Sequence, residues 1–142
     1  MWHDSNFPNL NTEGYDITSP PTPRYNCIAW AGGDDWNWWE PDPFGIYFWP
    51  ANAPGEYTIA SYKAAFQALG YLPCDSPDLE PVTEKVALYA LADGQPTHAA
   101  RQTPDGKWTS KLGSQEDITH TLTGLEGPIY GRVVMILKRR MS

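Results

Sequence analysis

The most regular pattern of apolar and polar positions lies between residues 58 and 70. Four apolar side chains recur there at helical spacing: Ile59, Tyr62, Phe66 and Leu69. Thr58 precedes them and can accept a hydrogen bond from an amide of the first helical turn, and Gly70 is typical of the residue that follows a helix. The pattern predicts a helix over residues 58–69.

A second, shorter helix is expected to begin near Cys27. Prolines crowd residues 19–23 and hold the chain extended, so they keep this stretch out of a helix. Asn26 can then cap a helix that ends at residues 32–33, which are both glycine. Residues 1–24 are expected to be loop-like.

The second half of the chain shows the alternation and the turn residues of a sheet. Strands are predicted over residues 84–91, 97–103, 107–112 and 129–138, and glycines mark the turns between the first three. Residues 72–77 are expected to form a linker. Ser114 is expected to cap a short helix with three apolar side chains: Ile118, Leu122 and Leu125.

Helices that precede an antiparallel meander indicate an α+β fold. The length of 142 residues suits one domain with its own core. We therefore expect an extended N-terminal segment over residues 1–23 and a single domain over residues 24–142, in which the N-terminal helices pack on the meander.

Composition and charge narrow the class of function. The net charge of −7 makes the chain a poor match for a phosphate backbone, so nucleic acid is not an expected partner. No run of about 18 apolar residues is present, so no membrane-spanning helix is expected. Residues 1–8 hold no apolar stretch suited to a signal peptide, so we expect a cytoplasmic protein, with signal-independent export left open. The sequence does not define the oligomeric state.

The cysteines and histidines are too dispersed for a metal site or a disulfide framework. Cys27 and Cys74 are far apart in the chain and are expected to be free thiols. The three histidines, His3, His98 and His120, lack zinc-like spacing. We expect no metal and no cofactor.

Cys27 and His98 are the candidate catalytic pair. A cysteine at a helix N-terminus is expected to favour the reactive thiolate, because the helix end supplies partial positive charge and free amides that can also bind an oxyanion. A histidine at the start of a strand packed on that helix can act as the base. The competing interpretations are a small buried cysteine that packs its helix and a histidine bonded to a backbone carbonyl.

A third polar group should orient the imidazole ring of such a pair. Ser110 is the first candidate, because it can accept a hydrogen bond from a ring N–H, and Gln102 is the second, because it shares a strand face with His98. Asn26 is expected to cap the helix or to donate to the oxyanion. His120 is expected to be a surface residue.

Five tryptophans lie between positions 30 and 49. We expect most of them to be buried, because so much exposed apolar area is unusual on a soluble monomer. Trp30 or Trp36 is expected to line a substrate cleft near Cys27. The alternative is a non-catalytic binding or interaction module that uses the tryptophan-rich loop, residues 34–56, as its contact surface.

Four segments carry a resemblance to a family of small bacterial proteins with no settled function. These are residues 25–31 (Tyr-Asn-Cys-Ile-Ala-Trp-Ala), 47–50, 97–102 and 108–113, and the resemblance spans roughly residues 24–138. More distantly, the layout is similar to NlpC-type members of the papain-like superfamily.

This resemblance implies a papain-like fold and a cysteine-dependent amidohydrolase or acyltransferase. It assigns Cys27 as the nucleophile and His98 as the base. NlpC-type enzymes usually carry His, Asn, Asp or Gln at the third position, where this chain offers Ser110 or Lys111. The implied partner is a peptide or another amide-bearing substrate, and the sequence does not choose among such substrates.

Overall fold

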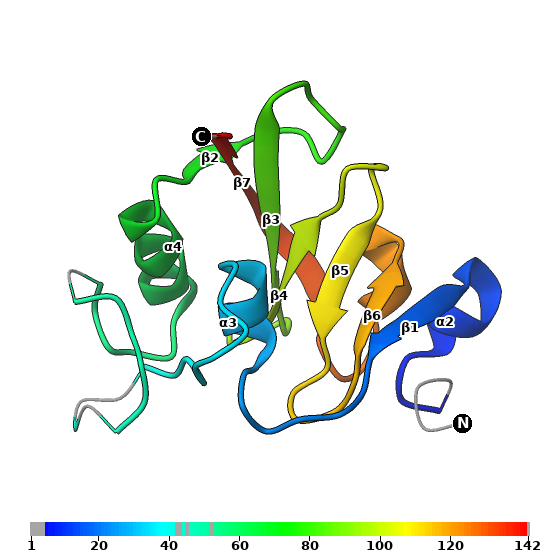
Figure 1. The fold of residues 1–142 in the computed structure, drawn as a ribbon, viewed down its shortest axis with the longest axis horizontal. Helices are drawn as coiled ribbons and strands as arrows, with labels where there is room; N and C mark the ends of the chain where they lie inside the picture. The colour runs from blue at the N-terminus through cyan, green and yellow to red at the C-terminus, as the bar shows by residue number, and fades with distance from the viewer. Residues whose placement is uncertain (1–4, 42–43, 45, 52, 142) are drawn as a thin grey trace.

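A seven-stranded antiparallel sheet runs through the molecule (Figure 1). The computed structural model describes residues 5–41, 44, 46–51 and 53–141. In chain order, the elements are α2 (Pro8–Glu13), β1 (Tyr15–Ser19), α3 (Cys27–Ala31), α4 (Ile59–Ala68), β2 (Leu72–Cys74), β3 (Thr83–Ala90), β4 (Pro96–Gln102), β5 (Trp108–Lys111), β6 (Asp117–His120), the 3-10 helix η1 (Leu122–Leu125) and β7 (Arg132–Arg140). The expected α+β class is confirmed.

The strands follow the spatial order β1-β6-β5-β4-β3-β7-β2. Strands β3 to β5 form the predicted meander, β6 extends it as a strand that was not predicted, and β7 returns beside β3. The pairing brings Tyr89 opposite His98, and the register shifts between Tyr89 and Ala90. The sheet therefore carries an irregularity next to the candidate histidine.

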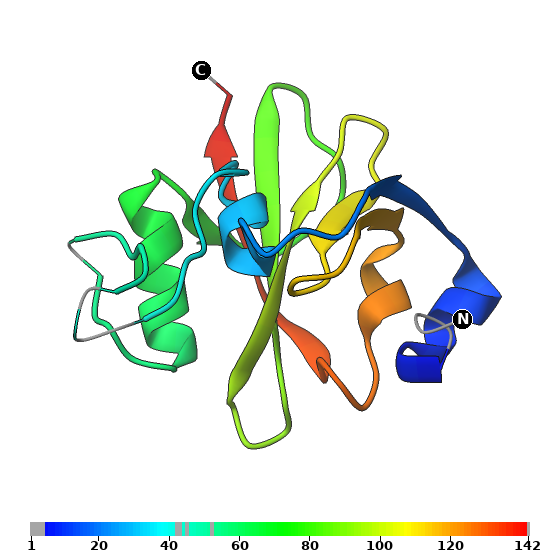
Figure 2. The same ribbon diagram turned by 60° about the horizontal axis from the view of Figure 1, so that its bottom comes forward.

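Each face of the sheet has its own core. Alternation places Val86, Leu88 and Ala99 in a cluster with α3 and α4. Residues on the opposite face, including Ala87 and Tyr89, pack with α2 and η1. Figures 1 and 2 show α3 and α4 together and α2 at the far end of the sheet. The two candidate residues belong to different faces of the sheet, since Cys27 packs against the first core and the His98 ring contacts Tyr89 of the second.

The helices predicted near Cys27 and over residues 58–69 are confirmed together with their N-terminal caps. The Asn26 side chain accepts a hydrogen bond from the amide of Ala29 at the start of α3. The Thr58 hydroxyl accepts one from the amide of Ser61 at the start of α4. Among the described residues 34–57, the loop contains no regular helix or strand beyond one bridge between Trp39 and Phe48.

The loop-like assignment of residues 1–24 is wrong in part, while residues 1–4 lie outside the described residues. Within residues 5–24, α2 packs on η1, and β1 pairs with β6 at the edge of the sheet. The linker predicted at residues 72–77 is also wrong in part, because β2 pairs with β7 at the opposite edge. Both strands are short edge strands, whose burial pattern is too mixed to alternate clearly.

The short helix predicted after Ser114 is wrong as well. Residues 117–120 form strand β6, which pairs with β5, and only residues 122–125 form a single 3-10 turn. The amide of Leu112 bonds to the carbonyl of Glu116, so the chain reverses in a tight hairpin. Ile118 and Leu125 have helical spacing in sequence, yet both are buried through different elements.

Candidate functional site

Asn26 holds the start of α3 in place. Its Oδ1 accepts from the amides of Ala29 (3.3 Å) and Trp39 (3.2 Å), and its Nδ2 donates to the carbonyl of Trp39 (2.7 Å). The side chain is therefore committed to capping and to anchoring the tryptophan-rich loop. Of the two roles considered for Asn26, the structure shows the cap.

Cys27 is the first residue of α3, and its sulfur lies close to backbone amides. Burial raises the pKa of the Cys27 thiol to about 11, although the amides of Ala99, Ile28 and Cys27 itself and the charge of Lys111 act in the opposite direction. The residue as a whole is only half-buried, but the shift reflects the surroundings of the sulfur. The expectation that the helix end leaves a thiolate at rest is therefore wrong, because desolvation outweighs it.

His98 lies on β4, and its side chain is fully buried. Nε2 lies 2.8 Å from the hydroxyl oxygen of Ser110. The ring stacks on Tyr130, with 4.1 Å between centroids and 10° between planes, and meets the edge of Tyr89 at 5.2 Å. Burial holds the pKa of His98 well below its usual value, and His120 lowers it further. The imidazole is thus neutral and fixed in orientation.

The other ring nitrogen of His98 has no partner. Nδ1 is buried, and none of the described residues forms a hydrogen bond with it. A buried polar atom without a partner costs stability, so it calls for an explanation at a candidate site.

Two observations relate Cys27 to the surroundings of this ring, although successive side chains of β4, Ala99 and His98, point to opposite faces of the sheet. The amide that acts on the sulfur belongs to Ala99, the residue directly after His98. Burial raises the pKa of Tyr130, and the charge of Cys27 raises it further, so the thiol is electrostatically coupled to the ring that stacks on His98. No hydrogen bond joins the sulfur to the imidazole in this conformation.

Ser110 makes the contact with His98 that was expected of a third residue. Lys111 projects to the other face of β5, where its Nζ donates to the carbonyls of Thr22 (2.8 Å) and Gly113 (2.6 Å). Of the two third-position candidates, only Ser110 touches the imidazole.

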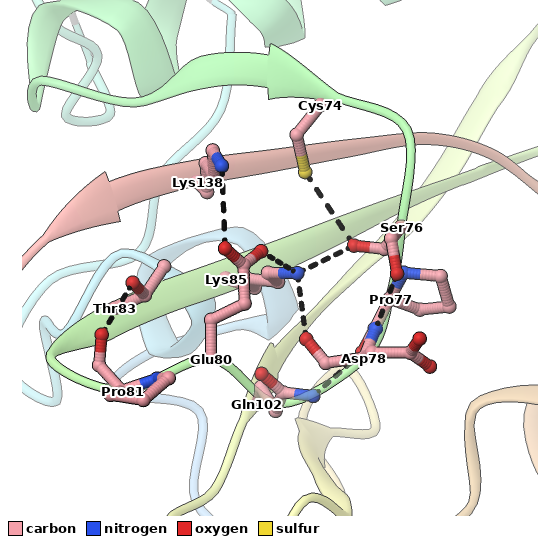
Figure 3. A network of polar contacts seen from close by, with 10 residues as sticks. All are labelled: Cys74, Ser76, Pro77, Asp78, Glu80, Pro81, Thr83, Lys85, Gln102 and Lys138. Carbon is pink, nitrogen blue, oxygen red and sulfur yellow. Dashed lines mark hydrogen bonds and ion pairs between the residues drawn. The ribbon is translucent and has the colours of Figure 1, made fainter.

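Gln102 serves a different part of the molecule. Its Nε2 donates to the carbonyl of Pro77 (2.8 Å), beside a network centred on the buried Lys85 (Figure 3). Lys85 Nζ bonds to the carbonyls of Ser76 (2.7 Å) and Asp78 (2.6 Å) and pairs with Glu80 (2.5 Å). The second cysteine adjoins this network, and both cysteines are free thiols.

His120 is the residue that the sequence interpretation missed. It is 1% exposed, and its Nε2 lies 2.7 Å from the Ser110 hydroxyl oxygen. Its Nδ1 lies 2.6 Å from the carbonyl oxygen of Thr121. The expected surface position is wrong, because residues 117–120 form a strand. Their alternation, Asp-Ile-Thr-His, is the signal that could have placed His120 on the face of Trp108 and Ser110.

The tryptophans divide between packing and exposure. Trp39 is buried, and Trp30 is half-buried, with its Nε1 donating to the Thr109 hydroxyl at 2.9 Å. Trp36 is 69% exposed, and the guanidinium of Arg24 lies 4.8 Å from its ring centroid. Of the two residues expected in a cleft wall, Trp36 is the open one.

Two pockets are lined by side chains other than those of the candidate pair. One, of about 700 Å³, is lined by residues that include Glu84, Arg101 and Arg139, and another of about 700 Å³ by residues that include Ala90 and Arg132. Neither is lined by Cys27 or His98. The case for chemistry at Cys27 and His98 therefore rests on the contacts of their side chains and not on either of these pockets.

Comparison with protein families gives one match. Residues 16–138 match the family described as Domain of unknown function (DUF7689). The chain belongs to this family. The DUF7689 match begins within β1 and ends within β7, so it takes in both candidate residues and all seven strands. No curated protein and no solved structure matches the chain.

Among the described residues, no group of three or more His, Cys, Asp or Glu side chains is placed to hold a metal ion. No helix in that part of the chain is long and apolar enough to cross a membrane.

Proposed function

We propose that this protein is a cysteine-dependent amidohydrolase or acyltransferase of papain-like, NlpC-type architecture. One observation carries the proposal. The His98 ring is held by Ser110 through Nε2, while Nδ1 stays buried without a partner, and the Cys27 sulfur lies against the amide of the next residue, Ala99. A base fixed through one nitrogen and open at the other is the arrangement that a cysteine nucleophile needs.

The proposed reaction requires Cys27 Sγ to reach His98 Nδ1, whose ring lies on the face of the sheet opposite to α3, and it begins with proton transfer between these two atoms. The sulfur then forms a bond to the substrate carbonyl carbon, and the carbonyl oxygen takes the negative charge. Collapse of this intermediate breaks the carbon–nitrogen bond, and His98 returns the proton to the leaving amine. Water or an acceptor amine then cleaves the thioester, which gives hydrolysis or transfer.

The pKa shifts define the resting state of this pair. Burial raises the pKa of Cys27 and lowers that of His98, so both groups are neutral at pH 7. The thiolate therefore forms only as the proton moves to His98 during attack. Amides that already face the sulfur stabilise the charge once it develops.

Turnover of simple amides tests the proposal. A panel of fluorogenic dipeptide amides should be cleaved by the wild type, and Cys27→Ala should abolish cleavage. His98→Ala should lower kcat/KM by roughly 10²–10⁴-fold, the usual contribution of general acid–base catalysis. Cys74→Ala is the matched control, because it removes the other thiol and should leave the rate unchanged. Undiminished turnover by Cys27→Ala would overturn the proposal.

A binding module is the second candidate, and a specific observation favours it. Several apolar side chains of the tryptophan-rich loop are strongly exposed: Trp36 (69%), Phe44 (86%) and Ile46 (75%). Large exposed apolar patches are typical of interaction sites. An absence of turnover across the panel, together with a ligand whose binding depends on Trp36, would support this alternative.

A further inference from the structure

A continuous line of hydrogen bonds runs from a backbone carbonyl to the candidate base. The Thr121 carbonyl oxygen lies 2.6 Å from His120 Nδ1, and His120 Nε2 lies 2.7 Å from the Ser110 hydroxyl oxygen. The same hydroxyl oxygen lies 2.8 Å from His98 Nε2. Each of these hydrogen bonds is buried or partly buried, so water has little access to replace one of the donors or acceptors.

The protons along this line can be assigned from chemistry alone. A carbonyl oxygen only accepts, so His120 Nδ1 must carry a proton and donate it to Thr121. In a neutral imidazole the other nitrogen is then an acceptor, so Ser110 donates its single proton to His120 Nε2. With that proton committed, the Ser110 oxygen can only accept from His98, so His98 Nε2 must carry the proton.

The reverse order of donors is impossible. If Ser110 donated to His98, His120 Nε2 would have to donate to Ser110, and neutral His120 would then present a lone pair to the Thr121 carbonyl. Two acceptors would face each other across 2.6 Å. The carbonyl of Thr121 therefore fixes the protonation of the His98 ring, which is three hydrogen bonds away.

We propose that His120, acting through Ser110, fixes His98 in the tautomer that has its proton on Nε2 and its lone pair on Nδ1. His120 is then a positioning residue, since it touches neither the thiol nor a substrate. The consequence for catalysis rests on the proposed function: only a lone pair on Nδ1 can take the proton of Cys27. In this tautomer the buried, unpartnered Nδ1 carries the lone pair that can accept a proton.

The rings around His98 restrict the alternative of a ring flip. Tyr130 stacks on one side at 4.1 Å, and Tyr89 closes another with its edge. The Tyr89 hydroxyl is itself anchored to the carbonyl of Leu122 at 2.7 Å, and the Thr97 hydroxyl holds the carbonyl of Tyr130 at 2.6 Å. The relay thus selects the tautomer, and the aromatic frame selects the ring orientation.

Imidazole nitrogen NMR tests the tautomer directly. In ¹⁵N-histidine-labelled wild type at pH 7, long-range ¹H–¹⁵N correlations should show His98 with a protonated Nε2 and an unprotonated Nδ1. His120 should show the opposite pattern. The variants His98→Asn and His120→Gln each remove one set of signals and so assign the remainder. A protonated Nδ1 on His98 in the wild type would overturn the proposal without any variant.

Two substitutions at position 120 then separate the relay from simple packing. His120→Phe fills the volume but accepts no hydrogen bond, so the His98 proton should redistribute from Nε2 toward Nδ1. His120→Gln can accept through its side-chain oxygen and should restore the wild-type tautomer. An unchanged His98 tautomer in a folded His120→Phe variant would overturn the proposal. If that variant does not fold, Ser110→Ala removes the same link and should release the tautomer.

The rate of the proposed reaction gives an independent second readout. His120→Phe should lower kcat/KM by at least about 10²-fold, given that a wrong tautomer in a serine-protease triad costs about 10⁴ in kcat. His120→Gln should recover most of this loss. If the tautomers are as stated but the wild type cleaves no amide, the inference stands and the proposed function fails.

Discussion

At the scale of single residues, the sequence identifies the candidate side chains of the site but not their ionisation. Cys27, His98 and Ser110 stand out because nucleophile, base and acceptor follow in a known order. The pKa values of Cys27 and His98 depend on how deeply each group is buried, and burial is a property of the whole packed chain. The second histidine, His120, was missed because the hairpin between β5 and β6 is what brings it within hydrogen-bonding distance of Ser110.

The pH dependence of Cys27 alkylation follows from its raised pKa. In a Cys74→Ala background, the rate with iodoacetamide should rise roughly tenfold per pH unit from pH 7 toward pH 10, because only the thiolate reacts and its pKa is about 11. The same protein unfolded in urea should level off near the ordinary thiol pKa. Mass spectrometry of quenched samples measures both curves. A plateau below pH 8 in the folded protein would contradict the assigned burial.

At the scale of elements, the predictable parts were those with strong local signals. α4 carries an apolar face between Thr58 and Gly70, and β3 to β5 carry alternation between glycine turns. The strands that the sequence did not predict are short. β1, β2 and β6 have three to five residues and are stabilised by pairing with a neighbouring strand. The partners of β1 and β2 are distant in sequence, so they leave no local pattern that predicts these two strands.

Gly131 connects the β7 strand to the His98 surroundings, and its replacement should be costly. It has a φ of +74°, and an added Cβ would lie 2.0 Å from the Ala90 carbonyl oxygen. Gly131→Ala should therefore lower the free energy of unfolding by more than about 3 kcal/mol, through steric overlap with backbone as well as strain.

Gly94→Ala is the matched control for this change. Gly94 also has a positive φ, of +89°, but nothing lies within 4 Å of an added Cβ. Its cost should stay near the 1–2 kcal/mol expected for the left-handed conformation alone. Urea unfolding of both variants measures the difference, and equal costs would show that the chain at Gly131 moves freely.

The tryptophan-rich loop offers an internal comparison of packing and exposure. Trp39 is 3% exposed, and Trp39→Ala should destabilise the protein by about 3–5 kcal/mol, the cost of emptying a buried aromatic site. Trp36 is 69% exposed, and Trp36→Ala should leave the melting temperature nearly unchanged. Thermal melts decide this, and similar melting temperatures for the two variants would contradict the packing of Trp39.

At the scale of the whole molecule, the sheet collects groups from distant segments into one buried polar line. β4 supplies His98, β5 supplies Ser110 and β6 supplies His120, so three consecutive strands each give one member. All three side chains lie on the face opposite to α3, as strand alternation requires. The arrangement of these three side chains therefore depends on the pairing of β4, β5 and β6 at the centre of the sheet.

The two buried neutral histidines should make the protein sensitive to acid. Burial lowers the pKa of His120 to about 4 and that of His98 well below its usual value. Unfolded histidines bind protons near pH 6.5, whereas these folded ones do not, so stability is complete above that pH and falls as the pH drops toward 4. The shift of His120 alone corresponds to about 3 kcal/mol over this window.

His120→Gln removes this titration, so the variant should lose correspondingly less stability between pH 7 and pH 4 than the wild type. Urea unfolding at several pH values gives both curves, and parallel curves would mean that His120 binds its proton at the same pH in the folded and unfolded protein, which would contradict the lowered pKa.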